Sequence, residues 1–256
     1  MVRTEERRIL LAGAAAIALA AALLIPALYQ LGLRLAPARP DPAAIPRTTG
    51  LMRAAIWARA DGGPTTTMRP LTVFSFIGHR VCRALASRHD DATARAEGRA
   101  ACLHEHPGIE AADALAGVHL RAQAVNPHSF RTGLGHVSTA AWMSRNWTAE
   151  TLVDALAAIG NFGYGWRGAT AASTGYFSKP VEALAPEEAA LLATIIENRR
   201  QDPWCNAAGA LDSRNRVLRR MLGNGVIDEP SVTRASLAPL HLAPRPAGPP
   251  CESTTP

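Results

Sequence analysis

An unbroken apolar run near the start of the chain predicts a membrane-spanning helix. Residues Ile9 to Leu28 read ILLAGAAAIALAAALLIPAL and contain no charged side chain. A helix needs ~20 apolar residues to cross a bilayer, and this run has that length. The arginines among the first eight residues favour a cytoplasmic N-terminus. Residues 1–34 are therefore predicted to be a cytoplasmic tip and a single transmembrane anchor.

A cleaved signal peptide is the alternative interpretation of the same run. The apolar core of a signal peptide usually has ~7–15 residues, so this run is long for one. A small-x-small site at Ala36-Pro37-Ala38 comes late and has proline in its middle. We favour the uncleaved anchor, in the inner (cytoplasmic) membrane. Both interpretations place the following domain in the periplasmic or another extracytoplasmic compartment.

After the anchor, the pattern of apolar positions changes to that of amphipathic helices. Four prolines in residues 35–50 indicate an extended linker. Helices are predicted over 51–60, 71–87 and 109–124. In the second of these, the apolar residues at helical spacing are Phe74, Ile77, Val81 and Leu85.

The second half of the chain carries clearer signals for helix ends. Thr148 is predicted to cap one helix, which Gly160 ends. Pro186 is predicted to open another, and Asp212 or Ser213 to cap the last. The fold class is thus mainly α, with one domain over 51–236 and a disordered Pro-rich tail over 237–256.

Charge and cysteine content add few constraints. The net charge is +6, but the arginines are dispersed and form no long run, so nucleic acid is not an expected partner. Arginine far outnumbers lysine in this chain, and a genome rich in Arg codons explains that ratio as well as an anionic partner does.

The four cysteines lack the spacing of a zinc site. Outside the cytoplasm they could form two disulfides with three possible pairings, and four free thiols are the alternative.

The segment from Phe162 to Leu222 carries a series of motifs in a specific order. These are Phe162-Gly163-Tyr164-Gly165-Trp166-Arg167-Gly168, Ala171-Ala172, Tyr176-Phe177-Ser178-Lys179, then Leu184, Glu188, Ala190, Leu192 and Ala193, then Asp202-Pro203, and Arg214, Val217, Leu218 and Met221. The series resembles the later part of the family 51 glycosyltransferase domain of penicillin-binding proteins and monofunctional transglycosylases. The resemblance covers roughly residues 99–228 and is best over 148–228. It implies a lysozyme-like helical fold and the polymerisation of lipid-linked peptidoglycan precursor.

Upstream, the family's catalytic motifs are altered. Its first motif, Glu-Asp-x-x-Phe-x-x-His-x-Gly, aligns with the segment ending at Gly108, which puts Arg99 in the place of the catalytic Glu. Its second motif aligns with 135–146, where both glutamines are missing. Its third, Arg-Lys-x-x-Glu, has no counterpart before the helix that follows Trp147. The resemblance therefore implies that both catalytic Glu positions are lost.

Other residues are candidates for the missing roles. Glu105 and His106 are the best catalytic candidates, although a solvated carboxylate and a local cap for the Pro107-Gly108 turn are the favoured interpretation. The resemblance implies substrate binding by Ser138, Thr139, Arg145 and Asn146, the last two toward phosphate, with an exposed helix end as an equal alternative. His136 replaces a small family glycine and is expected to fill the donor pocket.

Three functional hypotheses follow from the resemblance. The favoured one is a noncatalytic relative in cell-wall biogenesis that binds lipid-linked precursor or glycan strands at the membrane, or scaffolds other cell-wall synthases. The alternatives are an active, divergent peptidoglycan glycosyltransferase and a lysozyme-like hydrolase. No cofactor is expected, except that an active enzyme could use a divalent metal such as Mg²⁺ to neutralise the pyrophosphate leaving group.

Overall fold

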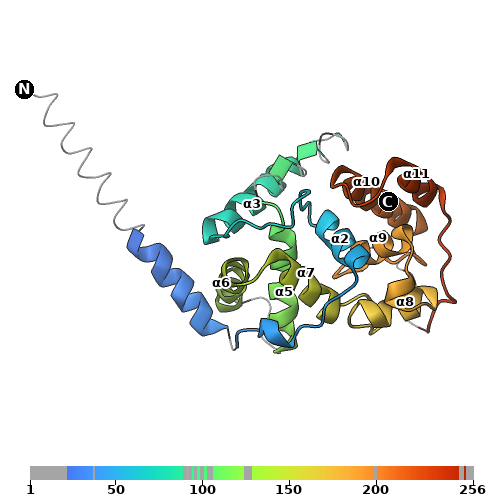
Figure 1. Ribbon diagram of the computed structural model, residues 1–256. Coiled ribbons are helices and arrows are strands. Elements are labelled where there is room, and N and C mark those ends of the chain that lie inside the picture. The colour runs from blue at the N-terminus through green and yellow to red at the C-terminus, as the bar shows by residue number, and fades with distance from the viewer. Residues whose placement is uncertain are drawn as a thin grey trace, which may run out of the picture.

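The computed structural model describes residues 22–36, 38–88, 91, 94, 97–98, 101–102, 106–123, 129–198, 201–247 and 251. The described residues form a mainly helical domain and contain no strand, as the sequence predicts (Figure 1). The helices are α2 (Gly50–Arg59), α3 (Val73–Ala86), α5 (Ile109–Ala122), α6 (Phe130–Asn146), α7 (Ala149–Ile159), α8 (Ala169–Phe177), α9 (Pro186–Ile195), α10 (Ala207–Gly223) and α11 (Glu229–Leu237). Short 3₁₀ turns occur at Pro42–Ala44 and Val181–Ala183.

Side-chain caps fix where several of these helices begin. The Thr148 hydroxyl accepts a hydrogen bond from the Thr151 amide at 3.1 Å, which confirms the predicted start of α7. Thr49 caps α2 in the same way, and Ser129 caps α6. These polar oxygens satisfy amides in the first turn that have no partner within the helix.

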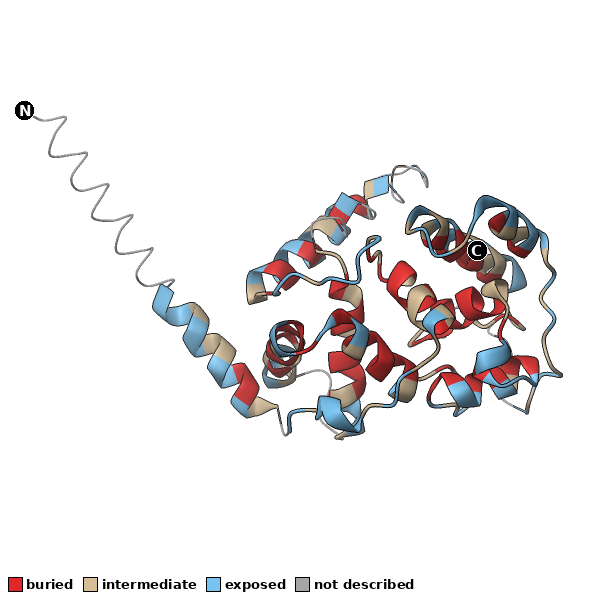
Figure 2. Cartoon of the chain, in the orientation of Figure 1, coloured by how far each residue is buried: buried red, intermediate tan, exposed pale blue. Residues whose placement is uncertain are grey.

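The core is formed by apolar side chains from α2, α5, α7, α9 and α10, and Figure 2 shows buried residues concentrated on their inner faces. Met52 and Ile56 of α2 are fully buried, so this helix belongs to the core although it precedes the family-like segment. Arg53 on α2 forms a two-pronged contact with Asp154 on α7, with both N–O distances 3.0 Å. The first part of the domain is therefore integral to its packing.

The glycine-dense segment after α7 forms a tight turn. Gly163, Gly165 and Gly168 all have positive φ values, between 80° and 84°. At Gly168 a Cβ would collide with the carbonyl group of Ala158. The turn therefore needs glycine here both for its backbone conformation and for close packing against α7.

The last part of the chain differs from the prediction. Helix α10 begins at Ala207, where the Asn206 side chain accepts from the Gly209 amide at 3.0 Å, and not at Asp212 or Ser213. The Ala-rich stretch before Asp212 continues the helix because alanine has the best helix propensity. A further helix, α11, then follows.

The region 237–256, predicted to be disordered, includes a segment that lies along the domain. Residues 238–247 are extended, and Leu240 and Leu242 pack against the core. The Ala243 amide donates to the Tyr176 carbonyl at 2.8 Å. Its proline content prevents a helix there, but apolar contacts hold it, together with this backbone hydrogen bond and side-chain hydrogen bonds from Arg214 and Trp204 to its carbonyls.

The four cysteines form two disulfides, so the alternative of four free thiols is wrong. Cys82 of α3 is bonded to Cys102, and Cys205 to Cys251. The first joins α3 to the segment before α5, and the second joins Cys251 to the residue just before the N-cap of α10.

The predicted membrane segment lies mostly outside the described residues. Its last part belongs to a helix over 22–35, which leads away from the domain (Figure 1). Among the residues that the structure describes, no helix is both long enough and apolar enough to cross a bilayer. The anchor therefore stays a prediction.

Candidate functional site

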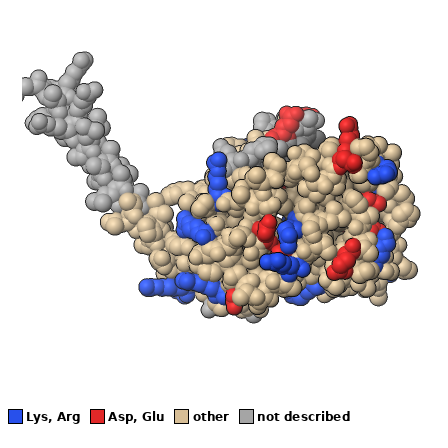
Figure 3. Space-filling model, in the orientation of Figure 1, with Lys and Arg blue, Asp and Glu red and all other residues tan. Residues whose placement is uncertain are grey.

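A polar cleft of about 720 Å³ lies between α2, α3, α5, α10 and the loop after α9. Its walls are rich in arginine and carry three carboxylates. The charged and imidazole side chains that line it are Arg59, His79, Arg80, Arg83, Glu110, Asp113, Glu197, Arg216 and Arg220. On the face of Figure 3, basic and acidic side chains likewise lie interspersed on a mostly uncharged surface.

Each of the three cleft carboxylates contacts a cationic side chain. Glu110 receives a hydrogen bond from Arg83 at 2.7 Å. Glu197 pairs with Arg121, and its other oxygen accepts from the Asn161 amide at 2.8 Å. Both carboxylates are thus engaged by neighbouring side chains or backbone within the cleft wall.

The third carboxylate, Asp113, lies beside His136. His136 Nε2 is 3.1 Å from Asp113 Oδ1 and donates to the Asp113 carbonyl oxygen at 2.9 Å. Burial alone would raise the pKa of Asp113, but the hydrogen bond and charge of His136, together with Arg80 and His79, hold that pKa below its usual value. His136 thus fills space between α5 and α6 and orients a carboxylate of the cleft wall.

The arginines outnumber the carboxylates. Arg59 and Arg216 form no ion pair with any carboxylate that the structure describes, and Arg216 donates instead to the Ser213 hydroxyl at 2.6 Å. Burial lowers the pKa of Arg59, while the charges of Glu110 and Glu197 raise it. An arginine remains charged at neutral pH, so the cleft presents net positive charge to an anion.

The sequence-predicted site residues lie outside the residues that line this cleft. Ser138 and Thr139 are buried on α6, and their hydroxyl oxygens have no hydrogen-bond partner among the described residues. Ser138 faces the helix over 22–35, where a Cβ added at Gly32 would collide with the Ser138 side chain. Their substrate-binding role stays a prediction.

Arg145 and Asn146 are exposed at the end of α6. The Arg145 guanidinium lies over the Tyr29 ring, 5.0 Å from its centroid. The Asn146 side chain donates to the Trp142 carbonyl at 2.8 Å. The structure therefore brings Arg145 against the helix over 22–35, and contact of either residue with phosphate stays a prediction.

Of the two catalytic candidates, the structure describes His106 and not Glu105. Glu105 lies outside the described residues. His106 precedes the turn at Pro107-Gly108, and its Nδ1 is buried without a hydrogen-bond partner among the residues that the structure describes. His106 is not among the described residues that line the cleft.

Several motif residues that carry the family resemblance hold the fold together. Tyr176 donates to the Phe162 carbonyl at 2.8 Å, and Lys179 pairs with Glu188 at 2.7 Å. Arg214 is almost fully buried. Its two terminal nitrogens donate to the Ser236 and Ala238 carbonyls, each at 2.7 Å. In this chain these residues serve as structural contacts.

The described residues hold no group of three His, Cys, Asp or Glu side chains that could bind a metal ion.

Sequence reasoning missed the cleft arginines. A faint signal exists, because Arg80 and Arg83 are spaced i, i+3 and Arg216 and Arg220 are spaced i, i+4, which places each pair on one side of a helix. Nothing in the sequence shows that α3 and α10 face each other across a cavity.

Comparison with known proteins finds similarity to transglycosylases over part of this helical domain. Residues 118–222, from within α5 to the end of α10, match the family described as Transglycosylase. The chain is 40% identical over 88 residues to Penicillin-binding protein 1A of Mycolicibacterium smegmatis, covering 34% of this chain and 11% of the relative. It is 38% identical over 80 residues to Penicillin-binding protein 1B of Escherichia coli, covering 31% of this chain and 10% of the relative.

The chain thus spans about a tenth of the length of the curated relatives that it matches. Over about a third of its own length it is distantly homologous to penicillin-binding proteins 1A and 1B, and its match to the transglycosylase family is confined to residues 118–222.

Proposed function

We propose that this protein is a membrane-anchored, noncatalytic transglycosylase relative that binds the anionic group of a lipid-linked peptidoglycan precursor in the arginine-rich cleft. Its role would lie in cell-wall biogenesis at the outer face of the inner membrane, as a binding protein or as a scaffold for other cell-wall synthases.

The observation that carries the proposal is the charge arrangement of the cleft. All three carboxylates contact cations, whereas Arg59 and Arg216 have no carboxylate partner among the described residues. A guanidinium is the preferred protein partner of phosphate oxygens because its planar donors match their geometry. Such a wall suits the pyrophosphate of a lipid-linked precursor.

The same arrangement argues against a general base on the described wall. Taking a proton from a sugar hydroxyl near neutral pH favours a carboxyl with a raised pKa. The pKa of Asp113 is instead lowered, and Glu110 and Glu197 are engaged in ion pairs with Arg83 and Arg121. Loss of a general base costs about 10²- to 10⁴-fold in rate.

The anchor in this proposal is supported by the apolar run over 9–28 and by its continuation into the helix over 22–35. Leu23 and Leu24 of that helix are 68% and 58% exposed, so the domain does not cover them. A lipid-linked substrate would lie within reach of a domain held at the bilayer surface.

An active, divergent glycosyltransferase is the second candidate. The observation in its favour is His106, whose buried, unpartnered Nδ1 adjoins Glu105 in the sequence. A histidine beside a carboxylate could orient it or share a proton with it. A hydrolase would need the same carboxylate as its acid.

Binding of labelled lipid-linked disaccharide precursor to the full chain in detergent micelles tests the proposed function. Fluorescence anisotropy should show saturable binding that Arg216→Gln weakens about tenfold, since one hydrogen bond to a charged group contributes ~1.5 kcal/mol. Inorganic pyrophosphate should compete.

Arg219→Gln is the matched control, because Arg219 is another exposed arginine of α10 and does not line the cleft. It should leave the affinity unchanged. Equal affinities of wild type and Arg216→Gln, or equal losses in both variants, would contradict a binding site in the cleft.

A further inference from the structure

Helix α3 carries a row of large apolar side chains that no described part of the protein covers. Phe74, Ile77, Val81 and Leu85 are each between 52% and 56% exposed. With about 100° between successive residues of a helix, the four side chains fall within an arc of about 80°. The row, termed the α3 apolar stripe, is continuous over the length of the helix.

The opposite side of α3 faces the cleft. Phe76, His79, Arg80 and Arg83 line the cavity. On the same helical projection they centre about half a turn away from the stripe. One helix therefore presents an apolar surface outward and a basic surface to the cleft.

We propose that the α3 apolar stripe rests on a lipid bilayer, so that α3 forms a second membrane contact beside the predicted anchor. The segment Val73–Ala86 contains two arginines, two phenylalanines and no acidic residue. An apolar face with Phe and Leu and a basic polar face are typical of helices that lie in the interface of anionic membranes.

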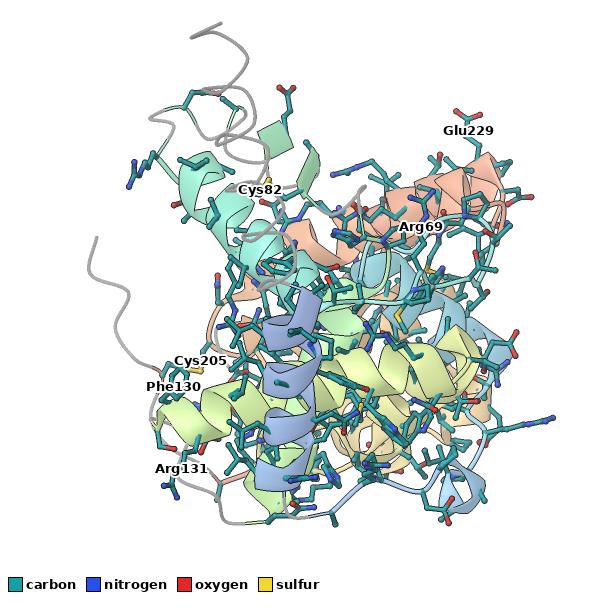
Figure 4. All side chains as sticks on the ribbon, turned by 90° about the vertical axis from the view of Figure 1, so that its left-hand side faces the viewer. Arg69, Cys82, Phe130, Arg131, Cys205 and Glu229 are labelled. Carbon is teal, nitrogen blue, oxygen red and sulfur yellow. A yellow bond between two sulfur atoms is a disulfide. The ribbon has the colours of Figure 1, made fainter. Side chains whose placement is uncertain are left out.

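The position of α3 favours lipid over a protein partner. Figure 1 shows α3 and the helix over 22–35 at the same end of the molecule, with α3 lying across the direction in which that helix leaves the domain. Figure 4, seen from that end, shows both helices on the near side and Phe130, which is 82% exposed, at the rim of the same view. A bilayer entered by the apolar run over 9–28 would therefore meet this end of the domain.

One disulfide and one ion pair hold α3 in this orientation. The Cys82–Cys102 disulfide and the Arg83–Glu110 ion pair, with an N–O distance of 2.7 Å, fasten α3 to the rest of the domain. The stripe is therefore fixed on the outside. At the bilayer, Arg80 and Arg83 on the cleft side would lie near the level of the lipid headgroups.

Photocrosslinking in vesicles tests the inference directly. The full chain is reconstituted in phosphatidylethanolamine–phosphatidylglycerol vesicles that carry radiolabelled lipid, with p-benzoyl-phenylalanine in place of Ile77 or Val81. The matched control carries it in place of Leu237, an apolar residue of α11 that is 81% exposed at the other end of the molecule. We expect at least fivefold more labelled lipid on the protein at positions 77 and 81 than at 237.

Equal lipid labelling at all three positions would overturn the inference. So would adducts between two copies of the chain at 77 and 81 in place of lipid adducts, because they would show that a second copy covers the stripe. Failure of the chain to float with vesicles would overturn it as well. The readout does not depend on precursor binding, so it is independent of the result with Arg216→Gln.

Discussion

Asp113 is a carboxylate whose charge depends on its neighbours. It is partly exposed, with 44% of its side chain accessible, and it touches His136 and lies 3.8 Å from Arg80. Burial works against its ionisation, but the hydrogen bond and the positive charges prevail and lower its pKa. The pKa of such a carboxyl is lower in the folded than in the unfolded chain, so its ionised form stabilises the folded protein. This stabilisation is fully present above the unfolded pKa. It is lost as the pH falls through the folded pKa.

Asp113→Asn should therefore lower the free energy of unfolding at pH 7 by about 0.5–1 kcal/mol, a range that allows for solvent screening of a partly exposed pair. The difference from wild type should shrink progressively as the pH falls below about 4. Urea unfolding across this pH range measures it. Glu182→Gln, at an exposed carboxylate, serves as the control. A difference that stays constant with pH would contradict the electrostatic origin.

At the scale of elements, two residues of the family-like motifs, Lys179 and Glu188, connect α8 to α9. Lys179 follows α8 and pairs with Glu188 in the first turn of α9. Glu188 also accepts from the Ala185 amide at 2.8 Å, which satisfies a free donor at the start of α9. Only 9% of the Glu188 side chain is accessible. This carboxylate therefore links two helices through one charged and one backbone contact.

Glu188→Ala should lower the free energy of unfolding by about 1–3 kcal/mol, because it leaves the Lys179 ammonium and the Ala185 amide without this partner. Glu187→Ala is the matched control in the same turn and should cost less than about 0.5 kcal/mol. Thermal unfolding of both variants compares them. Similar losses in the two would contradict the specific role of Glu188.

Element boundaries could be predicted where local chemistry sets them. Thr148 and Pro186 mark helix starts because a hydroxyl cap and a fixed φ angle act within one turn. The predicted start of α10 was wrong. Asp212 and Ser213 are suitable capping residues, but the Ala-rich stretch before them is already helical, so both lie inside α10. The extended segment over 238–247 could not be predicted, since the contacts of Leu240 and Leu242 with the core are long-range.

At the scale of the whole molecule, the family-like half could be identified from sequence, but the candidate site could not. The motifs around Tyr176, Glu188 and Arg214 identify the domain because they hold its fold together. The cleft combines α10, inside the matched segment, with α3, outside it. That combination arises only from tertiary packing, for which one sequence carries no direct signal.

The helical domain has a basic cleft, and for this cleft we propose binding without catalysis. The direct test is polymerisation of labelled lipid-linked disaccharide precursor by the full chain in vesicles, with Penicillin-binding protein 1B of Escherichia coli assayed in parallel as a relative. We predict no glycan polymer from this chain, in the wild type or in Glu105→Gln. Polymer made by the wild type and lost in Glu105→Gln would contradict the account and identify an active enzyme.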